Sequence, residues 1–473
     1  MTDTVKTAND ADPLVEQDRS SALMTVIFLC FAGMSVALMQ TLVIPIQSEL
    51  PQFLGTSAAN ASWVVTITLL GAAVAMPIAG RLGDLFGKQR VLVGSSVLML
   101  AGSLVCALSD TLVPVIAGRG LQGLAMGFIP VGISLMREVV PPAMATTAVA
   151  AMSATLGVGG AIGLPLSAWI VQTGDWHTLF WVATGLAVLV GLGSWFLVPH
   201  VHDGHPGTFD FGGALGLTVG LVTTLVGITK GNTWGWGSPR TVGAIVVGVL
   251  VLLAWGWYEL RRTEPLCDLR VTSRRPVLLT NIAALAIGFG MMAQAIVFPQ
   301  LLQLPEATGY GLGQSVLAAG LWMAPSGLMM LALAPFASWL MRTFGAKYAL
   351  ALGAAVLGGG YLLSFFLMSA PWQILIATLI CGAGVGIGYA AMPTLIMNAV
   401  PMNEAGSAVG INALMRSVGT TVASAVMATV LTGQTSALGI PTEGAFKACF
   451  LVATFAAFLG GAVALTIPRS EQA

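Results

Sequence analysis

Long apolar runs, separated by short polar segments that contain Gly and Pro, make up most of this chain. About 20 residues of α-helix are needed to cross the apolar core of a bilayer, and fourteen runs have roughly that length or more. We therefore predict fourteen membrane-spanning helices. The expected spans are 22–47, 59–80, 90–109, 112–135, 143–171, 179–199, 210–229, 240–259, 277–303, 314–340, 347–369, 372–398, 405–432 and 445–467.

Matching residues at a fixed offset indicate an internal repeat. Phe86-Gly87-Lys88 returns loosely as Phe344-Gly345-Ala346-Lys347, 258 residues later, and Gly159 returns as Gly419, 260 residues later. Helices 1–6 and 9–14 are therefore expected to be two copies of one six-helix unit, with helices 7 and 8 inserted between them. The expected regions are a disordered cytosolic tail at 1–21, the first half at 22–199, the inserted pair with a basic linker at 200–276, the second half at 277–467 and a cytosolic tail at 468–473.

Lys and Arg are unevenly distributed between the two sides of the predicted bundle. If the N-terminus is inside, the inner segments hold fourteen Lys and Arg, and the outer loops hold three, Lys230, Arg240 and Lys447. Because an excess of basic residues marks the cytoplasmic side, we expect both termini in the cytoplasm. The two remaining cations, Arg119 and Arg416, fall within predicted spans.

The composition excludes several classes of protein. The chain is 56% hydrophobic and 8% charged, whereas soluble domains average about 25% charged residues. A formal net charge of zero gives no indication of nucleic-acid binding. The five cysteines lack metal-ligand spacing, and no Gly-x-x-x-x-Gly-Lys-[Ser/Thr] nucleotide motif occurs. We expect no metal, no cofactor and no nucleic acid.

A charged stretch, Gly80-Arg81-Leu82-Gly83-Asp84-Leu85-Phe86-Gly87-Lys88-Gln89-Arg90, lies between the second and third runs. Gly80 permits close helix approach, Gly87 permits a positive φ, and Asp84 can pair with a cation or a helix N-terminus. The stretch resembles the loop between helices 2 and 3 of the major facilitator superfamily, Gly-x-Leu-x-Asp-x-x-Gly-[Arg/Lys]-x-[Arg/Lys]. The resemblance implies an all-α membrane protein with the major facilitator fold and a substrate site between its halves.

Two further stretches resemble the fourteen-helix drug–proton antiporter branch of that superfamily. Helix 4 contains Arg119-x-x-Gln122-Gly123, which puts a cation and an amide on one helical face. Helix 5 contains a Gly-rich run from Gly157 to Pro165, although Pro165 comes one position later than in that branch and the usual pair of glycines after it is absent. Small residues there would let helix 5 pack against the other half, and Pro165 would let it bend. In that branch the helix-4 arginine is associated with proton transfer.

One departure from that branch concerns charge. Its members have Leu-Asp-x-Thr in helix 1, with the aspartate in the proton path, whereas this chain has Leu38-Met39-Gln40-Thr41. No other acid is expected inside a span. Any titrating group must therefore lie at a helix end, with Glu138 or Asp110 nearest to helix 4, or on the substrate itself. Because a desolvated cation beside buried arginines is costly, we expect anionic or neutral substrates. The sequence leaves open whether the two buried arginines face one cavity.

Candidate site residues fall into two groups. Those expected to contact substrate or couple transport are Arg119, Gln122, Gln40, Trp63, Gln294, Asn412 and Arg416. Those expected to control the conformation are Gly80, Asp84, Gly87, Lys88, Arg90, Arg137, Gly159, Gly163 and Pro165. Asp84 is expected to hold either Arg137 or the N-terminal end of helix 13, near Glu404 and Ala405. Helices 7 and 8, in which no buried charge is expected, should be peripheral to the pathway.

The expected function is secondary active export of small amphiphilic compounds or drugs by alternating access, driven by an ion (proton) gradient. We expect a monomer in the plasma or inner membrane, with the lipid bilayer and the substrate as its partners. An importer or facilitator of a specific metabolite on the same fold is the alternative. A membrane enzyme would need a catalytic cluster, which the sequence lacks. The substrate and the coupling ion stay open.

Overall fold

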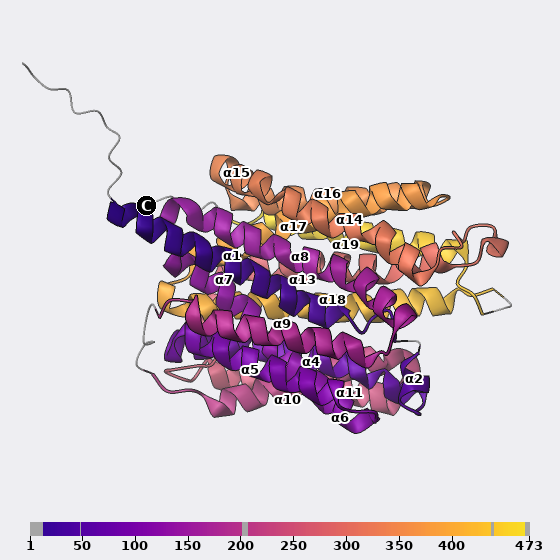
Figure 1. The fold of residues 1–473 in the computed structure, drawn as a ribbon, viewed down its shortest axis with the longest axis horizontal. Helices are drawn as coiled ribbons and strands as arrows, with labels where there is room; N and C mark the ends of the chain where they lie inside the picture. Colours follow the sequence, from indigo (N-terminus) through magenta and orange to yellow (C-terminus); the bar gives the residue numbers. More distant parts are fainter. Residues whose placement is uncertain (1–12, 48, 201–206, 437–438, 469–473) are drawn as a thin grey trace, which may run out of the picture.

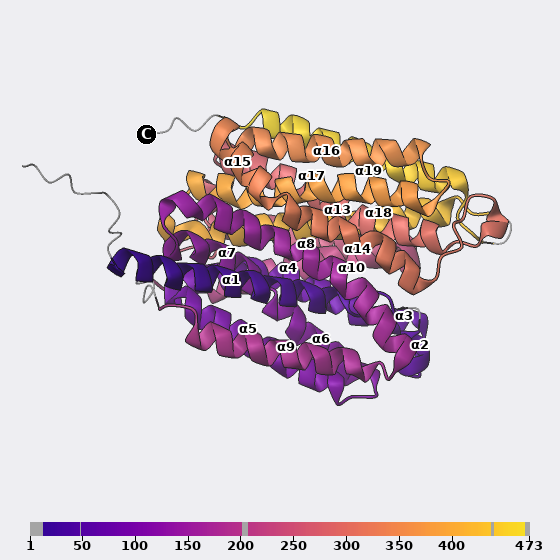
Figure 2. The same ribbon diagram turned by 45° about the horizontal axis from the view of Figure 1, so that its top comes forward.

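The computed structural model describes residues 13–47, 49–200, 207–436 and 439–468, and within these ranges the chain is helical with no β-strand. Figures 1 and 2 show long helices that run roughly parallel to one another. In chain order the helices are α1 (Pro13–Thr41), α2 (Leu50–Phe53), α3 (Ala58–Ala61), α4 (Trp63–Phe86), α5 (Lys88–Ala107), α6 (Leu112–Ala125), α7 (Phe128–Val139), α8 (Pro142–Thr173), α9 (His177–Phe196), α10 (Phe211–Trp234), α11 (Pro239–Glu259), α12 (Leu269–Thr272), α13 (Arg275–Gln303), η1 (Glu306–Thr308), α14 (Val316–Ala332), α15 (Ala334–Phe344), α16 (Ala346–Phe366), α17 (Pro371–Ala399), η2 (Met402–Glu404), α18 (Ala405–Gly433) and α19 (Glu443–Leu465).

The expected number of spans is confirmed. Thirteen helical stretches of the described chain are long and apolar enough to cross a membrane, and α14 with α15, bent by 40° at a short break, makes the fourteenth. The break precedes a proline in the first turn of α15, where a missing N–H is tolerated and the helix restarts readily. The first helix differs from expectation, because α1 begins at Pro13, inside the expected tail 1–21. Pro at the start of a helix, followed by good helix formers such as Leu14 and Glu16, explains that extension. Residues 1–12 and 469–473, which hold most of the expected tails, lie outside the described residues.

The halves meet mainly along two pairs of helices. α4 packs against α18, and α8 packs against α14. Glycines make these contacts close: a side chain at Gly80 would collide with the carbonyl of Gly406, and a Cβ at Gly327 would lie 2.5 Å from the carbonyl oxygen of Gly157. In Figure 2 the first half (indigo to magenta) lies below the second half (orange to yellow). We call the end of the bundle that holds Gly87 and Gly345 the motif end, and the opposite end, where α2 and α3 lie, the cavity end.

The inserted pair lies beside the α4–α18 contact. Three leucines of α10 form a hydrophobic cluster with residues of both halves, and α11 packs on the outer side of α10. The cluster contains Leu217, Leu221 and Leu225 from α10, Leu70 and Ala73 from α4, Ile411 and Leu414 from α18, and Leu266 and Cys267 from the linker.

The expectation that the inserted pair holds no buried charge is wrong. Lys230 and Glu259 are 4% and 2% exposed. The apolar run ends near residue 229, but α10 continues as helix to Trp234, so Lys230 lies in a helical turn and not in an outer loop. At the other end of the pair, Glu259 accepts a hydrogen bond from the backbone N–H of Cys267 at 3.3 Å.

Candidate functional site

A single glycine makes the turn between α4 and α5. Gly87 has φ 93° and ψ 133°, a conformation open to glycine and strained for other residues, so the positive φ expected there is confirmed. Gly345 makes the same turn between α15 and α16, with φ 92° and ψ 153°. These turns place the charged stretch 80–90 directly at the motif end.

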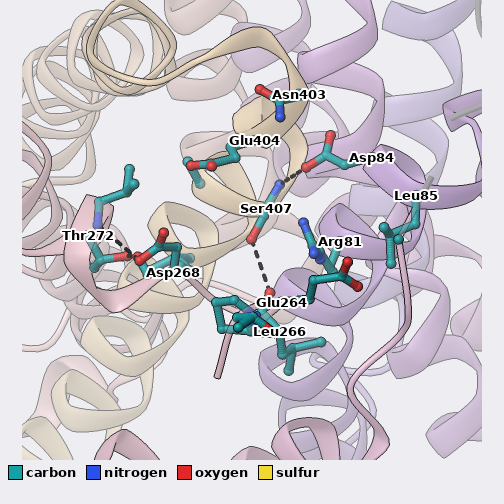
Figure 3. A pocket seen from close by; sticks show the side chains of 16 residues that line it. Arg81, Asp84, Leu85, Glu264, Leu266, Asp268, Thr272, Asn403, Glu404 and Ser407 are labelled. Atoms are coloured by element: carbon teal, nitrogen blue, oxygen red, sulfur yellow. Dashed lines mark hydrogen bonds between the residues drawn. The ribbon is translucent and has the colours of Figure 1, made fainter. Parts of the chain in front are cut away.

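Asp84 joins the two halves at this end. Its side chain is buried, and its oxygens accept the backbone N–H groups of Gly406 at 3.0 Å and Ser407 at 2.8 Å. These amides belong to the first turn of α18, where N–H groups have no intrahelical partner and the helix dipole is positive. The carboxylate of one half thus caps a helix of the other, and of the two partners considered for Asp84 the helix end is the one observed (Figure 3). We call this set of contacts the Asp84 latch.

Glycine at position 406 is needed for this approach, because an added Cβ would lie 2.6 Å from Asp84 Oδ1. Hydrogen bonds to an ionised group contribute about 1.5–3 kcal/mol each, and here they form only while the halves are closed at the motif end. The Asp84 latch is therefore a contact that can distinguish one conformation from another.

Other polar groups support the closed motif end. Lys88 is buried, contacts the Glu138 carboxylate and lies 4.0 Å from Asp84 Oδ1. Arg137 crosses between the halves to donate to the carbonyl oxygen of Met397 in α17. A second crossing joins the hydroxyls of Thr147 in α8 and Ser338 in α15, 2.8 Å apart. Arg90 is exposed and lies 3.5 Å from the carbonyl oxygen of Phe86, within its own half.

The linker between α11 and α13 covers the Asp84 latch. A cavity of about 300 Å³ separates the two and is lined by charged and polar side chains that include Arg81, Asp84, Glu264 and Ser407 (Figure 3). Ser407 donates its hydroxyl to the Leu266 carbonyl at 3.4 Å. The backbone N–H and the hydroxyl of Thr208 lower the pKa of Glu264, which keeps that carboxylate charged. The linker is thus tied to α18, the helix that Asp84 caps.

Arg119 is enclosed within the first half. It is 1% exposed, and its guanidinium donates to Gln122 Oε1 at 2.7 Å and to the carbonyl oxygens of Met39 at 3.2 Å and Val64 at 3.4 Å. The Met39 carbonyl belongs to the last turn of α1, where carbonyls lack helical partners and a cation is favourable. The residue that replaces the helix-1 acid thus binds Arg119 through its backbone. A cavity of only about 10 Å³, which Gln40 also lines, lies beside this cluster.

Arg416 lies in a separate cluster within the second half. Its Nη1 donates to Asn412 Oδ1 at 2.9 Å, and its guanidinium carbon lies 4.8 Å from the centre of the Tyr389 ring. Asn412 in turn donates to Asn281 Oδ1 at 3.0 Å, while the buried Nδ2 of Asn281 has no hydrogen-bond partner. Gln294, elsewhere in the same half, donates to a serine hydroxyl of α14 at 3.1 Å. The buried arginines therefore belong to two different networks.

Sequence reasoning missed Tyr389 as the partner of Arg416. The available signal was an aromatic residue directly after the small residues Gly382-Ala383-Gly384-Val385-Gly386-Ile387-Gly388 of α17. Glycines of that run bring α17 close to the backbones of α14 and α16, and the sequence does not reveal that Tyr389 meets Arg416.

The halves separate at the cavity end. A cavity of about 510 Å³ opens there between them. Its described lining contains polar neutral and apolar residues but no Asp, Glu, Lys or Arg, and none of the candidate substrate residues lines it. The lining comprises Ile44, Pro45, Gln47, Ala58, Ser62, Leu164, Ala295, Ile296, Pro299, Gln300, Gln303, Val316, Ala319, Gly320 and Met323.

The glycines of helix 5 serve two different contacts. Side chains at Gly159 and Gly163 would collide with α1, at the Met34 carbonyl and the Thr41 hydroxyl. These two glycines therefore pack within their own half, which corrects the expectation that they meet the other half. Gly157 does face α14, and α8 continues as a helix through Pro165.

Comparison with known proteins identifies both a family and a fold. A family model described as Major Facilitator Superfamily matches residues 29–424 and 282–472. The tetracenomycin C resistance and export protein of Streptomyces glaucescens is 28% identical over 418 residues, which cover 86% of this chain and 75% of that protein. The solved structure of the human organic anion transporter MFSD10 superimposes with a TM-score of 0.66 at 14% identity, covering 94% of this chain and 99% of that one. The expected fold is thereby confirmed.

One relative is considerably longer than this chain. An uncharacterized MFS-type transporter of Mycobacterium tuberculosis is 29% identical over 402 residues, which cover 84% of this chain and 57% of the relative. The chain spans little more than half the length of that relative.

Proposed function

The chain belongs to the Major Facilitator Superfamily, and on that premise we propose that it exports small amphiphilic compounds by alternating access. Membership makes it a multi-pass membrane transporter and not an enzyme. Export, the driving gradient and the substrate are our proposals.

The observation that carries the proposal is the difference between the two ends. The Asp84 latch closes the motif end, while a cavity of about 510 Å³ opens at the cavity end. In the orientation that the Lys and Arg distribution favours, the motif end is cytoplasmic and the molecule faces outward. An outward-facing cavity between two halves is the release state of an exporter and equally the loading state of an importer, so it supports alternating access and not the direction of transport.

The chemistry of the cavity supports neutral amphiphilic substrates. Its volume lies in the range of small-molecule sites, about 300–1,000 Å³, and amides of Gln47, Gln300 and Gln303 stand among apolar side chains. A desolvated cation would find no carboxylate in the described lining, and burying it unpaired is costly. Because Arg119 and Arg416 are occupied elsewhere, this preference rests on the cavity lining and not on the two arginines.

The resistance and export protein of Streptomyces glaucescens supports the direction of transport. No nucleotide-binding motif occurs in the sequence, so we propose that an ion gradient, with protons as the first candidate, drives export across the plasma or inner membrane. We also propose that the protein works as a monomer, with both termini in the cytoplasm.

Dye export from preloaded cells tests the proposal. Cells of an efflux-deficient host that express the protein should lose a neutral lipophilic dye faster than cells with an empty vector, and a protonophore should abolish the difference. Uptake from outside with no loss from preloaded cells would favour the alternative, an importer or facilitator. Export that persists undiminished with the protonophore would reject the proton gradient as the driving force.

A further inference from the structure

An unpaired lysine is buried in the inserted helix α10. Lys230 is 4% exposed. Its ammonium donates to the Ser62 hydroxyl at 2.6 Å and to the Ala59 carbonyl at 3.5 Å, and it lies 4.4 Å from the centre of the Trp63 ring. Among the described residues, no carboxylate lies within ion-pair distance of it.

A buried charge without a counter-ion is expensive, and such residues in membrane spans usually mark function. A cation above an aromatic face and two hydrogen bonds recover part of that cost. A neutral donor could make the hydrogen bond to Ser62 without the cost of burying a charge. The charge therefore requires a reason beyond the attachment of α10 to α4.

The position of Lys230 supplies that reason. Ser62, which accepts its hydrogen bond, lines the cavity at the cavity end, and so does Ala58 at the start of the same short helix. A single layer of chain thus separates the ammonium from the cavity. No charged residue is present in the described lining, so Lys230 is a fixed charge that can act on the cavity through this wall. Because Lys230 is 4% exposed, its field is screened less than that of an exposed cation.

We propose that Lys230 sets the charge selectivity of the cavity, disfavouring cationic substrates against neutral ones. The inference rests on the proposed function and assigns part of its specificity to the inserted helix pair. Trp63, expected to contact substrate, instead holds the lysine that acts on it. Lys230 acts on substrates through its electric field and does not contact them, since Ser62 lies between it and the cavity.

The test compares two dyes of similar size, ethidium as the cation and Nile red as the neutral compound. The measured quantity is the ratio of the ethidium export rate to the Nile red export rate, at equal protein levels in the membrane. Lys230→Gln, which keeps a hydrogen-bond donor for Ser62, should raise the ratio about five-fold or more. Lys230→Arg, which keeps the charge, should leave it near the wild-type value.

Arg240→Gln is the matched control, because Arg240 is an exposed cation at the start of α11 that does not line the cavity. Its ratio should match the wild type. An unchanged ratio in Lys230→Gln, or an equal rise in Arg240→Gln, would overturn the inference. If Lys230 has only a structural role, its replacement should lower both export rates together and leave their ratio unchanged.

A second measurement needs no variant. In proteoliposomes, the wild-type ratio should stay constant between about 0.02 and 0.5 M NaCl, because a buried charge is screened little. A ratio that rises with salt would assign the selectivity to exposed cations and contradict the inference. If the protein exports neither dye, the proposed function fails separately. The ratio of dye-binding constants of purified wild type and Lys230→Gln then decides the inference.

Discussion

The α4–α5 turn and the α15–α16 turn have the same backbone and different chemistry. Each is made by one glycine, with φ 93° at Gly87 and 92° at Gly345. Three residues before each glycine stands a charged side chain, Asp84 in the first half and Arg342 in the second. Asp84 is buried and reaches the other half, whereas Arg342 is exposed. The repeat has kept the geometry of the turn and changed its charge.

The helix ends that these turns approach explain the difference. The first turn of α18 has free N–H groups, which donate hydrogen bonds to Asp84. The corresponding helix, α8, begins with Pro142, which has no N–H, and the N–H of Met144 already donates to Pro141 at 2.8 Å. A carboxylate would gain little there. The two halves are instead joined on that side by the neutral hydroxyl pair of Thr147 and Ser338.

The distance between the packed helices also differs between the two halves of the repeat. Counted by the offset of 258 residues, the position equivalent to Gly80 is Ser338. α4 and α18 approach so closely that no side chain fits at Gly80, whereas the α15–α8 contact has room for a serine hydroxyl. At the motif end, the α4–α18 seam is therefore tight and charged, and the α8–α15 seam is looser and neutral. We expect the charged seam to control the conformation more strongly.

The largest effect is expected from Asp84→Asn. The substitution removes the charge that faces the N-terminus of α18, and the NH₂ group of the new amide can face the backbone N–H donors of Gly406 and Ser407. The loss of about 1.5–3 kcal/mol should lower transport roughly ten-fold or more, while the amount of protein in the membrane stays normal. The initial rate of dye export, divided by the protein level, measures the effect.

Arg342→Gln is the matched control in the second turn and should transport nearly normally. Equal losses in the two variants would remove the distinction between the turns. Near-normal export by Asp84→Asn would refute the role of the Asp84 latch.

Gly80→Ser should have the next largest effect, because it gives the tight seam the residue of the loose one. Overpacking costs about 1–3 kcal/mol, and the cost falls on the state in which the motif end is closed. In a variant without native cysteines, Gln300→Cys lines the open cavity and reports its accessibility to a maleimide. Gly80→Ser should slow this labelling several-fold, and labelling at the unaltered rate would show that the seam has spare room.

Substitution of either turn glycine should destabilise the protein by a similar amount, because the two turns have the same backbone geometry. Alanine at a positive φ is strained by about 1–3 kcal/mol, so Gly87→Ala and Gly345→Ala should lower the melting temperature of the purified protein by similar amounts. Gly94→Ala in α5 is the control, since its Cβ would meet nothing within 4 Å, and it should be neutral or slightly stabilising. A large drop for one turn and none for the other would show that the turns are not equivalent in geometry.

The smallest effect is expected at the neutral seam. Thr147→Val removes one hydroxyl pair between uncharged groups, which contributes about 0.5–1.5 kcal/mol. Export should fall less than about three-fold, well below the loss in Asp84→Asn. A loss as large as that of Asp84→Asn would place the controlling contact on the α8–α15 side instead.

The sequence by itself determined the spans, the glycine turns and the family. These depend on local properties: the length of an apolar run decides whether a helix crosses a bilayer, and a glycine in a charged turn indicates a positive φ. It also gave two alternative partners for Asp84, Arg137 and the N-terminal end of helix 13, because a carboxylate is favourable beside a cation or a helix N-terminus. The structure chose the helix end.

Only the tertiary structure decided which faces of the helices meet. In spans that are apolar on nearly every side, periodicity does not mark the face that packs against a given neighbour, so Gly159 and Gly163 could not be assigned to α1 before the helices were placed. The same limit hid two partners of Arg119, the carbonyl oxygens of Met39 and Val64, because every residue carries such a group. Lys230 was missed because the end of an apolar run is not the end of a helix: the last turn of α10 is polar in sequence, and only its contact with Ser62 and Trp63 makes it buried.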